Sequence, residues 1–139
     1  MGRIIGIDLG LKRTGLAVTD PDQMIATPLA AIETVHLMVY LKKYCSKEDV
    51  DGFALGDPLK LDGSPTHTTQ AVKQMAVKLK EVFPDKEVFP IDERYTSSLA
   101  MDAMVKGGTT KKYRRVKGNI DKISATIILQ SYLERKSYR

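Results

Sequence analysis

Three acidic residues stand at the ends of expected structural elements, where carboxylates are well placed to do chemistry. Asp8 ends a short apolar run, and Glu93 and Asp121 lie at the ends of later elements. A carboxylate that ends a buried strand is costly without a partner, which favours a functional role over a structural one. Hard divalent cations take oxygen ligands of this kind. If the three carboxylates converge in the fold, they indicate a metal site suited to phosphodiester chemistry.

A glycine-punctuated turn, Gly10 to Gly15, follows Asp8 directly. Glycines allow a phosphate or a metal ion to come close to the backbone. Lys12 and Arg13 in this turn are therefore candidates to hold a phosphate, and solvated turn residues are the alternative.

The elements that must position these residues follow from apolar periodicity and turn signals. We expect strands at 4–9, 15–19, 25–32, 53–56 and 87–91, and helices at 34–44, 64–83, 96–105 and from 119 onward. Three antiparallel strands followed by alternating helices and strands predict an α/β fold. Its mixed five-stranded sheet has strands 1–3 antiparallel, strands 4–5 parallel to strand 1, and helices on both faces. Residues 1–139 are long enough for a single domain.

Asp92 and Asp57 are alternatives to Glu93 in the predicted site. Side chains alternate along a strand, so Asp92 and Glu93 should point to opposite faces and only one should enter the site. If strand 5 lies two strands from strand 1, the longer Glu93 is favoured because the backbones are roughly 10 Å apart. Asp57, at the end of strand 4, is a secondary candidate. For Asp121 the alternative is a first-turn helix acid favoured by the macrodipole.

Composition excludes several classes of protein. Apolar residues make up 42% and charged residues 28% of the chain, as in ordinary globular proteins, and no apolar run is long enough for a membrane span. The single cysteine rules out an internal disulfide, and the N-terminus has no signal-peptide pattern, so we expect a cytoplasmic protein. The two histidines, His36 and His67, have no spacing that suits zinc.

Positive charge is concentrated at the C-terminal end. The net charge is +5, and from Lys106 onward ten bases face two acids. This favours a polyanionic partner over a merely solvated tail when an acidic site is nearby. The run Lys111, Lys112, Tyr113, Arg114 and Arg115 could track a nucleic-acid backbone, with the tyrosine stacking on a base.

Motifs across nearly the whole chain resemble the YqgF/RuvX family, which has the ribonuclease H-like fold. They are Gly6-Ile7-Asp8-Leu9-Gly10 with Lys12-Arg13 and Gly15, Gly56-x-Pro58 with Asp62-Gly63-Ser64, Asp92-Glu93-Arg94 with Thr96, and Asp121 opening the apolar segment 127–133.

The resemblance implies a nuclease that helps mature the 5′ end of the 16S ribosomal RNA precursor. It implies that Asp8, Glu93 and Asp121 are catalytic and bind Mg²⁺ or Mn²⁺, two ions being expected, with Asp8 as the bridge between them. We expect Arg94 to orient the scissile phosphate or brace Glu93, and Thr96 to contact a phosphate or cap a helix. The family was also proposed to resolve Holliday junctions, so branched DNA is the second candidate substrate.

Two further functions are compatible with parts of the sequence. A non-catalytic RNA-binding module that assists ribosome assembly would use the basic run without the acids. An actin-like ATPase or sugar kinase shares a phosphate loop like Gly6–Gly10, but it needs two such domains and 139 residues leave no room. We expect structured RNA as the partner, association with the ribosome or its precursor, no membrane, and a monomer or weak homodimer. Cutting two strands of a junction would need a symmetric dimer.

Overall fold

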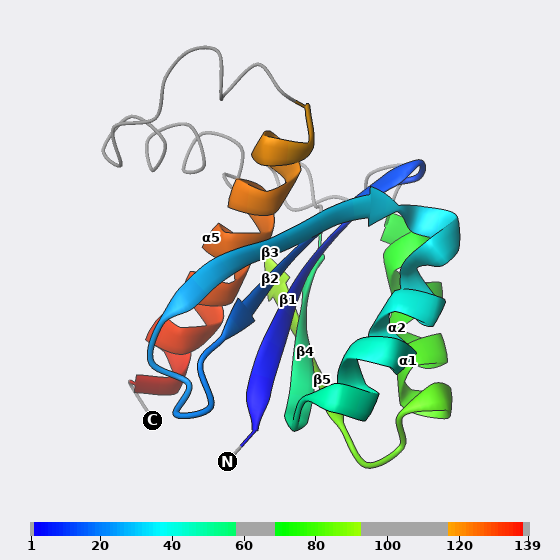
Figure 1. The fold of residues 1–139 in the computed structure, drawn as a ribbon. Coiled ribbons are helices and arrows are strands. Elements are labelled where there is room, and N and C mark those ends of the chain that lie inside the picture. The colour runs from blue at the N-terminus through cyan, green and yellow to red at the C-terminus, as the bar shows by residue number, and fades with distance from the viewer. Residues whose placement is uncertain (1, 58–68, 93–116, 138–139) are drawn as a thin grey trace.

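A five-stranded mixed sheet forms the centre of the molecule, with strand order β3-β2-β1-β4-β5 (Figure 1). The structure is a computed structural model that describes residues 2–57, 69–92 and 117–137. β2 pairs antiparallel with β1 and with β3, whereas β4 is parallel to β1 and to β5. This is the sheet that the sequence predicts. The strands are β1 (Arg3–Leu9), β2 (Arg13–Thr19), β3 (Ala26–Glu33), β4 (Val50–Asp57) and β5 (Glu87–Asp92).

Helices cover both faces of this sheet (Figure 1). On one face lie α1 (Leu37–Lys47) and α2 (Thr69–Val82), and on the other lies α5 (Lys117–Ser137). Each face has its own apolar cluster, because β1 is buried on both sides. No helix in the described ranges is long and apolar enough to cross a membrane.

The alternation of side chains along β1 assigns its residues to the two faces. Ile5, Ile7 and Leu9 belong to the cluster beneath α1 and α2. Ile4 belongs to the cluster beneath α5, together with Ala125 and other residues of that helix. The even-numbered positions of β1 therefore face α5.

Gly6 sets how closely α5 approaches the sheet. A Cβ atom at this position would lie 2.8 Å from the carbonyl oxygen of Ala125 and 2.9 Å from Cβ of Leu129. Real Cβ atoms do not come this close to other atoms, so only glycine permits the observed contact. The C-terminal end of α5 is tied to the start of β1, because Lys136 Nζ bonds to Gln23 Oε1 and Gln23 Nε2 donates to the Gly2 carbonyl. The helix thus runs antiparallel to β1.

Proline at position 28 lies on the edge strand, as its missing N–H requires. β3 is the outer neighbour of β2, and the register shifts so that Leu16 pairs with Ala30 while Ala17 pairs with Pro28. Leu29 is the extra residue of this bulge. The sequence indicates a break or an edge at Pro28, and the structure has both.

Thr34, the first residue of the helix expected at 34–44, would be its N-cap by residue type, and this expectation is wrong. A 3₁₀ turn (Thr34–His36) precedes α1, and neither its N-cap residue, Glu33, nor that of α1, His36, makes a side-chain capping hydrogen bond. The Thr34 hydroxyl donates instead to the Gly10 carbonyl at 2.7 Å. A threonine hydroxyl bonds to whichever acceptor the fold brings near, and here that acceptor is 24 residues away in sequence. The expected helix start at Ser64 and the short helix at 96–105 lie outside the described residues.

We predict that Gly6→Ala lowers the free energy of unfolding by about 1–3 kcal/mol, the usual cost of overpacking a core. The nearest atom belongs to the backbone of α5, so a side-chain rotation cannot relieve the clash. Urea denaturation measures the change. Val77→Ala, at an exposed position on α2, is the control and should shift the value by about 0.5 kcal/mol or less. Equal stability of wild type and Gly6→Ala would contradict the close approach.

Candidate active site

The C-terminal ends of the three parallel strands meet at one edge of the sheet. Ile7 pairs with Leu55, Gly56 pairs with Ile91, and Asp57 pairs with Asp92. Asp8 follows Ile7 directly and is level with Gly56, so Asp57 and Asp92 lie one residue beyond it at the same edge of the sheet. In sheets of this kind ligands bind outside the carboxyl ends of the strands.

Asp8 lies on the face of the sheet that α5 covers. It is two residues after Gly6, which contacts α5, and positions separated by two share a face. Its side chain is half-buried, between the buried Ile7 and Leu9. The carboxylate thus stands where the apolar interior ends, next to the helix that carries another predicted acid.

The backbone of α5 brings Asp121 toward the level of Asp8. Ala125 lies opposite Gly6, and Asp121 is one helical turn before Ala125, about 5.4 Å along the axis. Asp8 lies two residues after Gly6, about 6.7 Å along the strand. Because α5 and β1 run in opposite directions, the two displacements point the same way. The side chain of Asp121 lies outside the described residues.

Asp92 lies on the face of the sheet opposite to that of Asp8. Ile91 packs in the cluster beneath α5, so alternation places Asp92 on the other face, where it is exposed. Asp92 is therefore separated from the Asp8 face by the sheet itself. Glu93 is the next residue in the chain, and it lies outside the described residues. So do the other predicted contacts Arg94, Thr96, Lys111, Lys112, Arg114 and Arg115, and the side chain of Asp57.

The turn after Asp8 is held by Thr34. Its hydroxyl donates to the Gly10 carbonyl at 2.7 Å, and the two hydroxyl oxygens of Thr14 and Thr34 are 2.8 Å apart. Since the single O–H of Thr34 is used on Gly10, the Thr14 hydroxyl is the donor in the second bond. The backbone N–H of Thr34 also donates to the Lys12 carbonyl at 2.9 Å. Sequence reasoning missed Thr34 as a support of the site, and nothing in its own neighbourhood signals this role.

Lys12 and Arg13 begin the return from this turn into β2. Lys12 is exposed and Arg13 is half-buried at the first position of the strand. A Cβ atom on Gly10 would lie 2.2 Å from the Arg13 carbonyl oxygen, so the turn can close this tightly only with glycine at position 10. The turn therefore fixes the backbone of both basic residues relative to Asp8.

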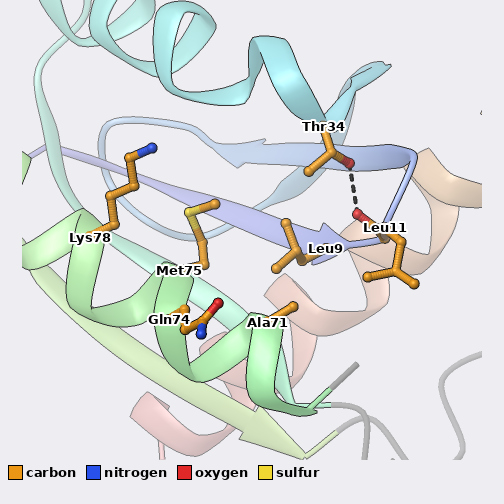
Figure 2. Close-up of a pocket in the computed structure, with 8 residues that line it drawn as sticks. Leu9, Leu11, Thr34, Ala71, Gln74, Met75 and Lys78 are labelled. Carbon is orange, nitrogen blue, oxygen red and sulfur yellow. Dashed lines mark hydrogen bonds between the residues drawn. The ribbon is translucent and has the colours of Figure 1, made fainter. Parts of the chain in front are cut away.

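A hollow of about 300 Å³ lies beside the turn, on the α2 face of the sheet. Figure 2 shows Leu9 and Met75 pointing toward one another across it, with Ala71 and Gln74 on α2 and Leu11 on the turn. Adjacent residues of β1 thus serve opposite faces: Asp8 lies toward α5, and Leu9 lines this hollow. The hollow is separate from the carboxylate face.

The described residues form neither of two other kinds of site, a complete metal-binding cluster and a cysteine nucleophile. There, no three His, Cys, Asp or Glu side chains come together in a metal-binding group. Burial raises the pKa of the Cys45 thiol, which disfavours the thiolate needed for a nucleophile. Asp8 is half-buried at the carboxyl edge of the parallel strands, on the face that α5 covers.

Known proteins resemble this chain over nearly its whole length. Residues 2–135 match the family described as RuvX: Holliday junction resolvase. The chain belongs to this family. A RuvX relative from Amoebophilus asiaticus, with the name "Putative pre-16S rRNA nuclease", is 49% identical over 133 residues, covering 96% of this chain and 94% of the relative. One of the same name from Flavobacterium johnsoniae is 44% identical over 138 residues, covering 99% of this chain and all of the relative.

Solved structures confirm the expected ribonuclease H-like fold class of this RuvX chain. T. thermophilus RuvC in complex with a Holliday junction substrate superposes with a TM-score of 0.58 at 15% identity, covering 99% of this chain and 98% of RuvC. The Fowlpox virus resolvase in complex with Holliday junction DNA has a TM-score of 0.59 at 13% identity, covering 96% of this chain and 98% of the resolvase. At these identities the likeness concerns the fold.

We predict that Thr34→Val lowers the free energy of unfolding by about 1–3 kcal/mol, because the Gly10 carbonyl and the fully buried Thr14 hydroxyl lose their partner. The double variant Thr14→Val/Thr34→Val should cost less than the sum of the two single variants, since it removes the orphaned donor as well. Chemical denaturation of the four proteins measures this. Strictly additive losses would show that the two hydroxyls do not interact.

Proposed function

We propose that the protein is a metal-dependent nuclease that hydrolyses phosphodiester bonds, most concretely at the 5′ end of the 16S rRNA precursor. The observation that carries the proposal is the position of Asp8 at the carboxyl edge of the parallel strands, on the face toward which α5 brings Asp121. The names of relatives 44–49% identical support RNA as the substrate. Those relatives are bacterial, so the protein and the precursor would meet in the cytoplasm.

The residues present fit Mg²⁺ or Mn²⁺. Asp8 offers a half-buried carboxylate beside a helix that Gly6 allows to come close, and carboxylate oxygens are the ligands such ions take. Asp8, Glu93 and Asp121 would hold the ions, two being proposed. When bound, such ions activate water and neutralise charge on the leaving oxygen.

The chain's own groups supply binding and orientation. The turn that Thr34 and Gly10 fix would present Lys12 and Arg13 to a phosphate next to Asp8. Arg94 would orient the scissile phosphate or brace Glu93, and Thr96 would add a phosphate contact or cap a helix. The basic run Lys111, Lys112, Arg114 and Arg115 would track the backbone of the nucleic acid and add affinity without sequence selectivity.

Branched DNA is the second candidate substrate, favoured by the description of the matching family and by the resolvase fold. Resolution of a junction would require two copies of the chain around a symmetric substrate, whereas trimming of precursor rRNA needs only a monomer. Competition between a precursor-rRNA fragment and a four-way junction at matched salt separates the two. An RNA-binding assembly factor would bind tightly and turn over neither.

We predict that Asp8→Asn lowers the rate of Mg²⁺- or Mn²⁺-dependent cleavage of a precursor-rRNA fragment by about 10²-fold or more. The physical reason is that a neutral amide is a poor ligand for a hard cation. The thermal midpoint should change little, since the side chain keeps its shape and half-exposed position. A gel assay of labelled RNA with added metal measures the loss.

Asp92→Asn is the matched control for Asp8→Asn. It makes the same chemical change at the same edge of the sheet, but on the face away from α5, so it should retain near wild-type cleavage. Glu93→Gln should behave like Asp8→Asn. Full activity of Asp8→Asn, or equal losses in Asp8→Asn and Asp92→Asn, would refute the proposed site.

Replacing Lys111, Lys112, Arg114 and Arg115 by glutamine should weaken RNA binding more than it moves the position of the cut. The slope of log affinity against log salt should fall by about 0.7 for each phosphate that the variant no longer neutralises. Titrations at several salt concentrations measure the slope, and product mapping locates the cut. A shifted cut at unchanged affinity would mean that the run selects the site instead of holding the backbone.

A further inference from the structure

A second hollow, of about 290 Å³, lies between β5 and the C-terminal half of α5. It is close to the lower end of the range for small-molecule sites, roughly 300–1,000 Å³. Its walls are aromatic and its rim is charged. The lining residues are Glu87, Phe89, Pro90, Ile91, Tyr132, Arg135 and Lys136.

Two aromatic rings form the wall of this hollow. The ring centroids of Phe89 and Tyr132 are 4.7 Å apart and their planes are inclined by 40°. Both side chains pack against the apolar cluster beneath α5 and are only partly buried. Partly exposed rings that are held against an apolar cluster offer a stacking surface for a planar group, such as a nucleobase.

Cations stand beside the rings. Arg135 is exposed, and within the described part of the chain it has no hydrogen-bond or ion-pair partner. Lys136 is held in place by its bond to Gln23, whose side chain also bonds to the Gly2 carbonyl and to Asp51. One carboxylate, Glu87, also lines the hollow and can accept a hydrogen bond from a ribose hydroxyl or a base amino group. The combination matches a nucleotide: a base for the rings, a phosphate for the cations.

We propose that this hollow binds one nucleotide of a single-stranded segment of the RNA substrate, with the base against Phe89 and Tyr132 and a backbone phosphate on Arg135. The proposal rests on the proposed function for the identity of the substrate. The hollow lies on the same face of the sheet as Asp8, because Phe89 and Ile91 belong to the cluster beneath α5.

The length of α5 fixes the distance between the two sites. Arg135 lies fourteen residues after Asp121, which is about 21 Å along the helix axis. A stacked strand advances about 3.4 Å per nucleotide, so the segment between the cut and the hollow would be about six nucleotides. The hollow would therefore hold RNA outside the catalytic site and measure a length of single strand from it.

Fluorescence anisotropy with a labelled hairpin RNA tests the proposal, using the full chain in EDTA so that nothing is cleaved. The hairpin carries a single-stranded flank of about 2 to about 12 nucleotides on its 5′ or its 3′ side, which brackets the six expected. For one of the two sides, affinity should rise about tenfold once the flank passes about six nucleotides, the usual effect of one stacked base.

Tyr132→Leu and Arg135→Gln should each remove most of this gain and leave the affinity for short flanks unchanged. Tyr132→Phe, which keeps the ring, should retain it. Lys43→Gln on α1, on the opposite face of the sheet, makes the same charge change as Arg135→Gln and should leave the gain intact. Equal affinity at every flank length on both sides, or equal losses in Arg135→Gln and Lys43→Gln, would overturn the proposal.

The outcomes separate this proposal from the proposed function. Cleavage in Mg²⁺ without any flank-length dependence of binding would remove the nucleotide site and leave the nuclease. A flank-length gain that depends on Tyr132, in a protein that cleaves no RNA, would support the site and remove the nuclease.

Discussion

The contact between β1 and α5 at Gly6 determines how close the backbones at Asp8 and Asp121 lie to one another. The absent side chain lets the backbone of α5 approach the central strand, and the carbonyl of Ala125 occupies the space that a Cβ would need. Asp8 and Asp121 are each a short step from this contact along their own elements. Their separation thus depends on one close packing contact and not on the flexibility of a loop, which is how rigid elements hold a functional group in place.

The other end of α5 is fixed by a small polar network. Lys136 bonds to Gln23, and Gln23 in turn bonds to the Gly2 carbonyl and to Asp51. Gln23 has a positive φ of 55°, an uncommon conformation for a residue other than glycine, and its side chain is almost fully buried. These hydrogen bonds offset the cost of the uncommon backbone conformation and the cost of burying a polar side chain. They tie the turn between β2 and β3 to the helix and the first strand, and so set the axial position of α5 over the sheet.

Much of this arrangement could be predicted from the sequence, because it depends on local patterns. The unbroken apolar run before Asp8 identifies a strand buried on both faces, and short connections with right-handed crossovers leave few ways to order five strands. Ile91 packs beneath α5, so alternation puts Asp92 on the face away from Asp8. The role of Thr34 could not be predicted, because its acceptor on Gly10 is brought near only by the pairing of β2 with β3. The contact of Gly6 with Ala125 is equally invisible before α5 is placed.

The contact that packs β1 against α5 also fixes the face of the sheet on which Asp8 lies. A slip of one residue in the register of β1 would move Asp8 to the α2 face, and the apolar pattern alone opposes this only weakly because β1 is buried on both faces. Here it would also place Ile5 or Ile7 where Gly6 now meets the backbone of α5, and that contact has no room for even a methyl group. The packing that buries the strand on both faces therefore also prevents the carboxylate from turning away from the helix. Any substitution that loosens α5 from the sheet should therefore disturb the proposed site before it unfolds the protein, because the backbone of α5 at Asp121 is held near β1 by this contact.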